Sequence, residues 1–406
     1  MTKPRSSRVS KAPTRRQFMG VSAAAIVAAA GERITASKRP TAASRAKAGQ
    51  GARRGPRFAY VGSSTSELPN KRGEGLSAYR IDPASGRWAR VQLLDREVNP
   101  SYLALDPRRP VLYAVHPAAN QVSAFSINDA TGELTLINRQ SCGGDNPVHL
   151  DLDATGKFLV VANYGSGSVV VLPVNADGSL GGKTDLVTLK GELGPHRTEQ
   201  AVSHPHHCPF DPAGRIVIVP DKGLDRLFVF NLDTARGALV PADPPSVKVR
   251  SGAGPRHIGF NPRLPYAYVI NELDSTVSTF RFKSSGGLEP LQVLPSIPAT
   301  FTGDNTGGAI GVAPSGRFVY VSNRGHDSVG VFRVDESSGL LTPVAWEPTK
   351  GATPRFIGLD PPGARLYAAN QRGDTIVEFD VSEASGALKA TGRIVVAGTP
   401  VCVVWR

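Results

Sequence analysis

Three side chains that can bind anions or transfer protons occur within one short stretch of the sequence, GAGPRHIGFNPRLPYAYVINELDSTVSTFRF, at positions 252–282. Arg256 and His257 precede an apolar run, and Glu272 follows the next apolar run. Arginine binds carboxylate or phosphate groups through paired hydrogen bonds, and histidine and glutamate exchange protons. The stretch therefore predicts either a site that binds an anion and moves a proton, or a structural ion pair between Arg256 and Glu272.

A repeated turn indicates the architecture that must position these side chains. A small or acidic residue followed by glycine and a large apolar residue recurs seven times, at intervals of 46, 46, 59, 49, 53 and 47 residues. These intervals are typical of the four-stranded blades of a β-propeller. The glycines of the seven copies are Gly86, Gly132, Gly178, Gly237, Gly286, Gly339 and Gly386.

A second repeated element keeps the same period and predicts the innermost strand of each blade. Its copies are NPSYLALD (99–106), NPVHLDLD (146–153), HPHHCPFD (204–211), GPRHIGFN (254–261), GGAIGVAP (307–314), TPRFIGLD (353–360) and TPVCVVW (399–405). The last copy reaches the end of the chain, while unpaired strand patterns stand at 57–64 and 75–82. The sequence therefore predicts an all-β, seven-bladed β-propeller in which the C-terminal strand pairs with N-terminal strands.

The predicted strand directions bring the candidate residues together. Because neighbouring antiparallel strands alternate in direction, the start of each innermost strand and the end of the next strand lie on one face of the disc. All eight histidines fall on that face, which favours one polar site over scattered turn contacts. The histidines are His116, His149, His196, His204, His206, His207, His257 and His326.

Two alternative chemistries stay open for the SHPHH segment. His204 and His206 alternate along an extended chain and so point the same way, which suits a pair of metal-binding imidazoles. The carboxylates of a calcium-type site do not converge in the repeats, so we expect no metal and no cofactor. Cys208 beside these histidines is a candidate nucleophile, but the three cysteines match no metal spacing and we assign them no role.

Charge and the N-terminal leader set the domain boundaries. Residues 1–55 contain 13 Lys and Arg against one acid, Glu32, so the other 34 basic and 33 acidic residues leave a net charge of +1 for the rest of the chain. This near-neutral body argues against a nucleic-acid partner.

Arg15, Arg16 and Phe18 precede a short apolar run that resembles a twin-arginine signal. We therefore expect a signal at 1–31, a basic linker at 32–55 and a propeller at 56–406, exported through the twin-arginine machinery without a membrane anchor.

Several motifs together resemble one known family. The segments PVHLDLDATGKFLVVANYGSGSVVVLPVNADGSL, GPRHIGFNPRLPYAYVINELDSTVSTF and SGRFVYVSNRGHDSVGVF are similar to the seven-bladed lactonases, which include a bacterial 6-phosphogluconolactonase and fungal carboxy-muconate cyclase. The resemblance covers about residues 57–406. It implies that His206, Arg256, Glu272 and Arg324 form the catalytic site. The alternative for Arg324, which lies in a tight turn, is a purely local structural role.

The resemblance also implies a reaction. Opening a lactone requires a polarised carbonyl, an activated water and a proton for the leaving alkoxide. The two arginines would bind an anionic substrate group and the oxyanion, and the low pKa expected for Glu272 beside them favours His206 as the proton shuttle. His149, His204 and His257 are expected to contact substrate. One departure is Ala309, which stands where many members have glutamate.

We therefore expect a monomeric, metal-free lactonase that hydrolyses a sugar or carboxylated lactone, 6-phosphogluconolactone being the nearest precedent. The first alternative is cyclisation of an unsaturated diacid, as in muconate cycloisomerases, at the same site. The second is a non-catalytic exported propeller that binds an envelope ligand through its rim. Product analysis separates the two enzymes, and exposed aromatic patches would favour the binding protein.

Overall fold

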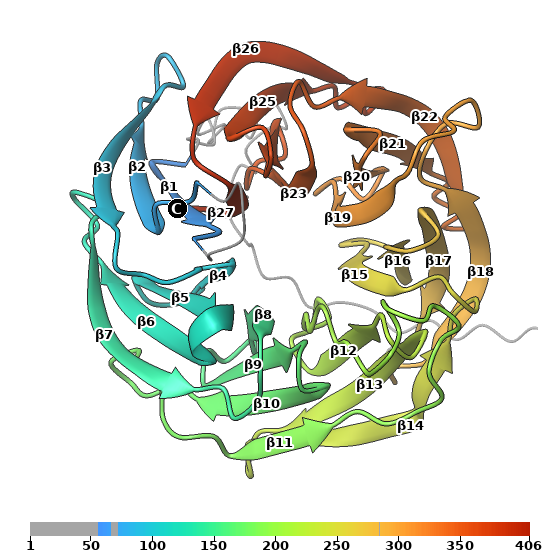
Figure 1. Ribbon diagram of the computed structural model, residues 1–406, viewed down its shortest axis with the longest axis horizontal. Helices are drawn as coiled ribbons and strands as arrows, with labels where there is room; N and C mark the ends of the chain where they lie inside the picture. The colour runs from blue at the N-terminus through green and yellow to red at the C-terminus, as the bar shows by residue number, and fades with distance from the viewer. Residues whose placement is uncertain (1–55, 66–71, 284) are drawn as a thin grey trace, which may run out of the picture. The chain divides into compact units, whose positions relative to one another are not determined.

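The computed structural model describes residues 56–65, 72–283 and 285–406, which form a ring of seven antiparallel sheets (Figure 1). This confirms the predicted seven-bladed β-propeller. The expected signal at 1–31 and linker at 32–55 lie outside the described residues. Among the described residues, no helix combines the length and the apolar character needed to cross a membrane.

The blades are numbered here in chain order, each from its innermost to its outermost strand. Blade 1 contains β4 (Tyr102–Leu105), β5 (Val111–His116), β6 (Gln121–Ile127) and β7 (Leu134–Ser141), with the short 3-10 helix η2 (Pro117–Ala119) after β5. Blade 2 contains β8 (Pro147–Leu152), β9 (Phe158–Asn163), β10 (Ser168–Pro173) and β11 (Asp185–Thr188). Blade 3 contains β12 (Ile216–Asp221), β13 (Arg226–Asp233) and β14 (Ala238–Lys248).

The remaining blades each have four strands. Blade 4 contains β15 (Pro255–Phe260), β16 (Tyr266–Asn271), β17 (Thr276–Phe282) and β18 (Leu288–Pro295). Blade 5 contains β19 (Thr306–Val312), β20 (Phe318–Arg324), β21 (Ser328–Val334) and β22 (Leu341–Pro348). Blade 6 contains β23 (Pro354–Leu359), β24 (Arg365–Asn370), β25 (Thr375–Val381) and β26 (Leu388–Val396). Blade 7 contains β27 (Pro400–Trp405), β1 (Phe58–Ser63), β2 (Leu76–Ile81) and β3 (Trp88–Leu94).

Blade 7 closes the ring as the sequence predicts. The C-terminal strand β27 is innermost and pairs antiparallel with β1, with Tyr60 opposite Val404 and Gly62 opposite Cys402. The pairing leaves no exposed sheet edge between the two ends of the propeller, which removes a site for aggregation.

Blade 3 differs from the others at its inner edge. The segment 204–211 takes the innermost position but pairs with β12 only through isolated bridges, Pro205 to Asp221 and Phe210 to Val217. Pro205 and Pro209 have no N–H group to donate, so a continuous ladder cannot form there. The irregular backbone carries His206 toward the propeller axis.

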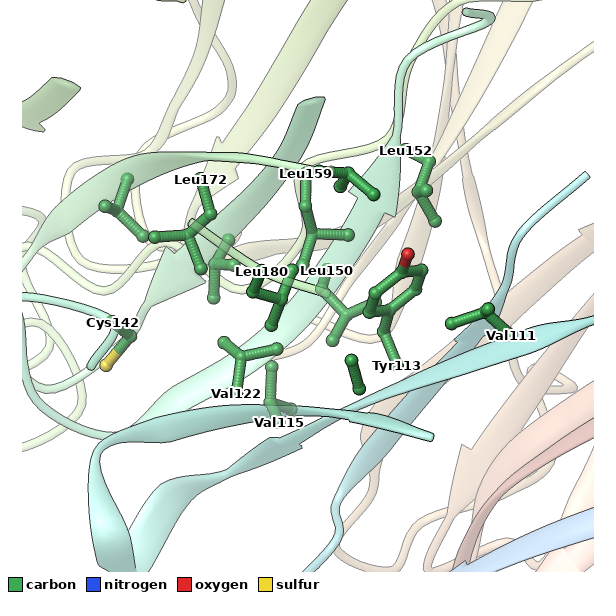
Figure 2. Packing of buried hydrophobic residues seen from close by; sticks show 14 residues of the cluster. Val111, Tyr113, Val115, Val122, Cys142, Leu150, Leu152, Leu159, Leu172 and Leu180 are labelled. Carbon is green, nitrogen blue, oxygen red and sulfur yellow. The ribbon is translucent and has the colours of Figure 1, made fainter. Parts of the chain in front are cut away.

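The hydrophobic core lies between neighbouring blades. One cluster joins strands of blade 1 with strands of blade 2 through buried side chains such as Tyr113, Val122, Leu150 and Leu172 (Figure 2). Other pairs of neighbouring blades are joined by clusters of the same kind. Because the apolar side chains are buried in these layers between the blades, polar side chains can line the central axis of the propeller.

The seven repeated glycines lie between the third and fourth strands of their blades, and all have positive φ, from 63° at Gly237 to 94° at Gly286. A side chain there would be strained and, at several of them, would strike the neighbouring blade: a Cβ on Gly339 would meet the Tyr266 ring at 2.3 Å. The glycine period seen in the sequence thus marks both the turn and the inter-blade contact.

Candidate active site

A polar cavity of about 350 Å³ lies at the propeller axis, where innermost strands begin and second strands end. Its lining comes from blades 1–4, 6 and 7, as expected from the alternating strand directions. The lining residues are Ser64, Asn99, Ser101, Pro117, Asn146, Val148, Tyr164, Glu199, His206, Lys222, Glu272, Arg355, Gln371 and Val401. A cavity of this size holds a sugar-sized ligand.

Buried asparagines position the residues that follow the second strands. In four blades an asparagine with almost no exposed surface is the last residue of the second strand, or in blade 5 the residue before the last, and its amide donates hydrogen bonds to its own blade or to the residue that follows the outermost strand of the preceding blade. This ties the turn to the blade and holds the next residue at the axial face. The four pairs are Asn163 with Tyr164, Asn271 with Glu272, Asn323 with Arg324 and Asn370 with Gln371.

β-Bulges in two innermost strands each place an arginine at the same level. The ladder between β15 and β16 shifts register between Pro255 and His257, which leaves Arg256 as the extra residue. The ladder between β23 and β24 shifts at the corresponding place and leaves Arg355 as the extra residue. Bulges of this kind redirect a side chain out of the ladder.

The Glu272 carboxylate is held by three cationic side chains. Its Oε2 lies 3.0 Å from Arg256 Nε and 3.1 Å from Arg324 Nη2, and its Oε1 lies 3.3 Å from Lys222 Nζ. Lys222 Nζ also lies 2.6 Å from Glu199 Oε2. The structure therefore brings together three of the predicted residues, and it adds Lys222 and Glu199, which the sequence analysis missed.

Backbone carbonyl groups of β19 accept further hydrogen bonds from Arg256 and Arg324, the two arginines that pair with Glu272. Arg256 Nη1 donates to Gly308 O at 2.7 Å, and Arg324 Nε donates to Gly307 O at 3.2 Å. A Cβ on Gly307 would stand 2.3 Å from the Asn271 carbonyl oxygen, so only glycine permits this approach. Ala309, the departure from the family pattern, packs in the cluster between blades 5 and 6 and does not line the cavity.

The electrostatic interactions in this cluster keep both the Glu272 carboxylate and the Lys222 amine charged. Burial alone would raise the pKa of Glu272, but Arg324, Arg256 and Lys222 outweigh it and lower the pKa to about 2. Burial alone would lower the pKa of Lys222, but Glu272 and Glu199 raise it above its ordinary value. At neutral pH the site therefore contains an ionised carboxylate and a protonated amine.

His206 lies in the cavity wall as a neutral base. Burial, and then the Arg256, Arg355 and Lys222 charges, hold the pKa of His206 well below its usual range. Its Nδ1 is buried without a hydrogen-bond partner among the described residues, and its ring lies edge-on to Tyr164 at 5.5 Å. An unprotonated imidazole at the wall of a polar cavity can accept a proton from water.

The other predicted substrate-binding histidines do not line the cavity. His204 stacks on Tyr164 at 4.2 Å with its Nδ1 3.0 Å from the Tyr164 carbonyl oxygen. His149 and His257 are buried against His207, with ring separations of 3.9 Å and 4.3 Å. Burial lowers the pKa of His149, His207 and His257, so these three pack as neutral rings. The predicted contacts of His149, His204 and His257 with substrate stay predictions.

Three further histidines have local contacts on the same face. His116 faces Glu97 at 3.6 Å, His196 Nδ1 accepts from the Glu199 backbone N–H, and His326 Nδ1 lies 2.7 Å from Ser328 Oγ. The eight histidines therefore lie on one face of the propeller, but only His206 is part of the cavity lining.

The thiol and metal alternatives find little geometric support. The described cysteines are free and buried, and burial raises the pKa of the Cys208 thiol, whose Sγ lies 3.2 Å from His149 Nδ1. A buried, protonated thiol outside the cavity lining is not placed for attack on a substrate. Within the described ranges, no three His, Cys, Asp or Glu side chains converge as a metal site would require.

The sequence contained signals for some of the missed residues. Tyr164, Lys222 and Gln371 follow second strands at the position that Glu272 occupies in its own blade. Arg355 follows a proline in TPRFIGLD just as Arg256 does in GPRHIGFN. Aligning the blades with one another would have found these four, whereas nothing in the repeat marks Glu199.

Comparison with known proteins decides the family. The lactonase, 7-bladed β-propeller family matches residues 58–405, which is nearly all of the described chain. The chain belongs to this lactonase family. A 6-phosphogluconolactonase of Bacillus subtilis is 36% identical over 301 residues, covering 73% of this lactonase and 83% of the relative. A 6-phosphogluconolactonase of Formosa agariphila is 34% identical over 307 residues, covering 73% and 84%.

A solved structure is similar over the same region. The periplasmic gluconolactonase of Pseudomonas aeruginosa superimposes with a TM-score of 0.78 at 31% identity, covering 86% of this lactonase and 98% of that chain. The similarity includes the whole ring, so the axial cavity belongs to the part of the fold that the two proteins share.

Proposed function

We propose that this lactonase hydrolyses a sugar or carboxylated lactone in the axial cavity, with His206 as the base and without a metal ion. As a member of its family the protein is a carboxylic ester hydrolase of the lactonase class. The observation that carries the residue assignment is the neutral, buried imidazole of His206, which shares the cavity wall with the ammonium of Lys222 and the Glu272 carboxylate.

The proposed reaction needs one water and one proton transfer in each direction. His206 takes a proton from water as the water oxygen bonds to the lactone carbonyl carbon, and the oxyanion that forms is stabilised by the nearby cations, Lys222 foremost. The bond between that carbon and the ring oxygen then breaks. The imidazolium returns its proton to the leaving alkoxide, so the product is the open hydroxy acid and His206 is neutral again.

Glu272, Arg256 and Arg324 act in this proposal as positioning residues. Arg256 is 2% exposed, and its guanidinium donors contact Glu272, Gly308 O and His257. Neither Arg256 nor Arg324 is part of the cavity lining. We infer that they hold Glu272 ionised, and that Glu272 in turn fixes Lys222 beside the reacting carbonyl.

The test of the proposal is a panel of three lactones with the purified protein: 6-phosphogluconolactone, gluconolactone and a carboxylated muconolactone. We expect hydrolysis of at least one above the uncatalysed rate, and an unchanged rate after incubation with a chelator. Loss of activity with chelator, restored by a divalent cation, would reject the metal-free site. Conversion of the muconolactone to an unsaturated diacid, in place of hydrolysis, would favour the cycloisomerase, and inactivity on every lactone of the panel would favour the binding propeller.

We further propose that the protein is exported by the twin-arginine route and acts as a monomer. The paired Arg15 and Arg16 before a short apolar run support export, and the similar gluconolactonase of P. aeruginosa is described as periplasmic. Because one chain supplies every residue of the cavity lining, the proposed site needs no second copy.

Replacing both Arg15 and Arg16 with lysine should abolish export while keeping the leader's charge. Cell fractionation should then find the double variant in the cytoplasm and the native protein outside it. A matched control replaces Arg5 and Arg8 with lysine, which leaves the pair intact and should leave export unchanged. Equal export of both double variants would argue against the twin-arginine signal.

A further inference from the structure

Arg355 is an arginine of the cavity lining that forms no ion pair within the part of the chain that the structure describes. It occupies in blade 6 the bulge position that Arg256 occupies in blade 4, and each follows a proline at the start of an innermost strand. The two blades therefore present the same guanidinium at the same level of the axis. Arg355 lines the cavity, whereas Arg256 does not.

The partner of the arginine differs between the two blades. The residue after the second strand is Glu272 in blade 4, and it pairs with Arg256 at 3.0 Å. The corresponding residue in blade 6 is Gln371, a neutral amide that also lines the cavity. Among residues 56–65, 72–283 and 285–406, no carboxylate forms an ion pair with Arg355 and its guanidinium donates no hydrogen bond.

Counted over the described residues, the charges around the cavity do not balance. Two carboxylates, Glu199 and Glu272, stand against four cationic side chains, and His206 is neutral. Burial, and then repulsion by Arg324, lower the pKa of Arg355 to about 10, so it stays protonated at neutral pH. The cationic side chains are Lys222, Arg256, Arg324 and Arg355.

We propose that Arg355 binds an anionic group, a phosphate or a carboxylate, carried by the lactone substrate at a distance from the reacting carbonyl. The inference rests on the proposed lactonase site and specifies its substrate class. Lys222 already faces two carboxylates, and Arg256 and Arg324 already face Glu272, so among these four cations Arg355 is the one whose guanidinium donors have no partner in the described ranges. A guanidinium binds phosphate or carboxylate through two parallel hydrogen bonds, which also orients the substrate.

The experiment compares charged and neutral lactones in three variants. Arg355→Gln removes the charge, and Gln371→Glu supplies to Arg355 the carboxylate that blade 4 supplies to Arg256. Arg372→Gln is the matched control, because it removes an exposed arginine next to Gln371 that is not part of the lining. Initial rates are measured with 6-phosphogluconolactone, a carboxylated muconolactone and neutral gluconolactone.

We expect Arg355→Gln and Gln371→Glu each to lower kcat/KM for the anionic substrate roughly 10- to 100-fold, mainly through KM, which is typical for loss of a charged hydrogen-bond pair. Both variants should lose much less activity on neutral gluconolactone, which carries no anionic group, and the rates of Arg372→Gln should stay near native on every lactone. Comparing the loss on the phosphorylated lactone with the loss on the carboxylated lactone shows whether Arg355 binds a phosphate or a carboxylate. Equal losses on charged and neutral lactones would overturn the proposal, since they would assign Arg355 to the oxyanion or to structure.

A binding measurement separates failure of this inference from failure of the proposed function. Calorimetry with 6-phosphogluconate and with gluconate needs no turnover, and because both carry the C1 carboxylate, the difference between them reports the phosphate. Tighter binding of 6-phosphogluconate than of gluconate, with the difference abolished in Arg355→Gln, supports the anion site even if the native protein hydrolyses none of the lactones. Lactone turnover with no preference for an anionic substrate, and no 6-phosphogluconate binding, would instead leave the lactonase site standing and reject the role of Arg355.

Discussion

Replacing His206 with glutamine lowers kcat for lactone hydrolysis by about 10²- to 10⁴-fold, the usual contribution of a positioned general base. Glutamine preserves much of the side-chain volume but cannot accept a proton from water. Because His206 is proposed to act on water and not to hold the substrate, KM should change little. Steady-state kinetics on the best lactone of the panel measures both constants, and the unfolding midpoint shows whether the variant is folded.

His326→Gln is the matched control for this experiment. His326 lies on the same face, but its ring contacts Phe301 and Ser328, and it is not part of the cavity lining. We expect it to keep native kcat. If His206→Gln were as active as His326→Gln, the proton would have to be transferred by another group.

The pH dependence of the native enzyme provides a second check on His206. Burial and neighbouring cations hold the pKa of His206 below its ordinary value of 6.5. The base is therefore unprotonated at neutral pH, and kcat/KM should fall only as the pH drops below that value. The acid limb of the profile should disappear in His206→Gln. An acid limb that is the same in both proteins would belong to another residue.

Replacing Glu272 with glutamine should destabilise the fold by roughly 3–5 kcal/mol, the usual cost of removing one partner from a buried ion pair. The variant leaves Arg256, Arg324 and Lys222 around a neutral amide, with the charge of Arg256 almost completely buried. Urea unfolding followed by tryptophan fluorescence measures the loss. Activity should fall as well, because Lys222 loses the group that positions it.

The control for Glu272 is a carboxylate in an exposed pair. Glu74 pairs with Arg90 at 2.6 Å, and both side chains are largely in solvent, so Glu74→Gln should cost less than about 1 kcal/mol. A Glu272→Gln variant as stable as Glu74→Gln would show that the buried cluster contributes little to folding.

The stabilisation by Glu272 should also depend on pH in a defined direction. Its folded-state pKa of about 2 lies below the ordinary value of 4.5. Its contribution is therefore complete above pH 4.5 and is lost as the pH falls toward 2, where the folded protein also binds the proton. The stability difference between native protein and Glu272→Gln should narrow across that interval.

Much of this protein was predictable because a propeller repeats. Each blade needs a glycine where the third strand turns into the fourth, and that requirement appears in the sequence as a period of 46 to 59 residues. The alternation of strand direction then places the starts of innermost strands and the ends of second strands on one face, whatever the side chains are. This is why the proximity of Arg256, Glu272 and Arg324 could be predicted from their places in the blades.

The contacts within that face could not be predicted in the same way. The repeat brings Arg355 and Arg256 to the same level, but only the packed ring shows that Arg256 is enclosed by Glu272 and the carbonyl oxygen of Gly308. Lys222 likewise reaches Glu272 across a blade boundary, and such distances depend on how the blades pack.

By itself, the sequence determined the strands, their turns, the closure of the ring and the face on which chemistry is possible, because these depend on local spacing and on the fixed geometry of antiparallel pairs. The tertiary structure decided which of the side chains on that face line the cavity. It buries His149 and His257 outside the cavity lining and leaves His206 and Arg355 in its wall. The reason is that burial and charge pairing at the axis depend on all the surrounding blades at once, and no single repeat contains that information.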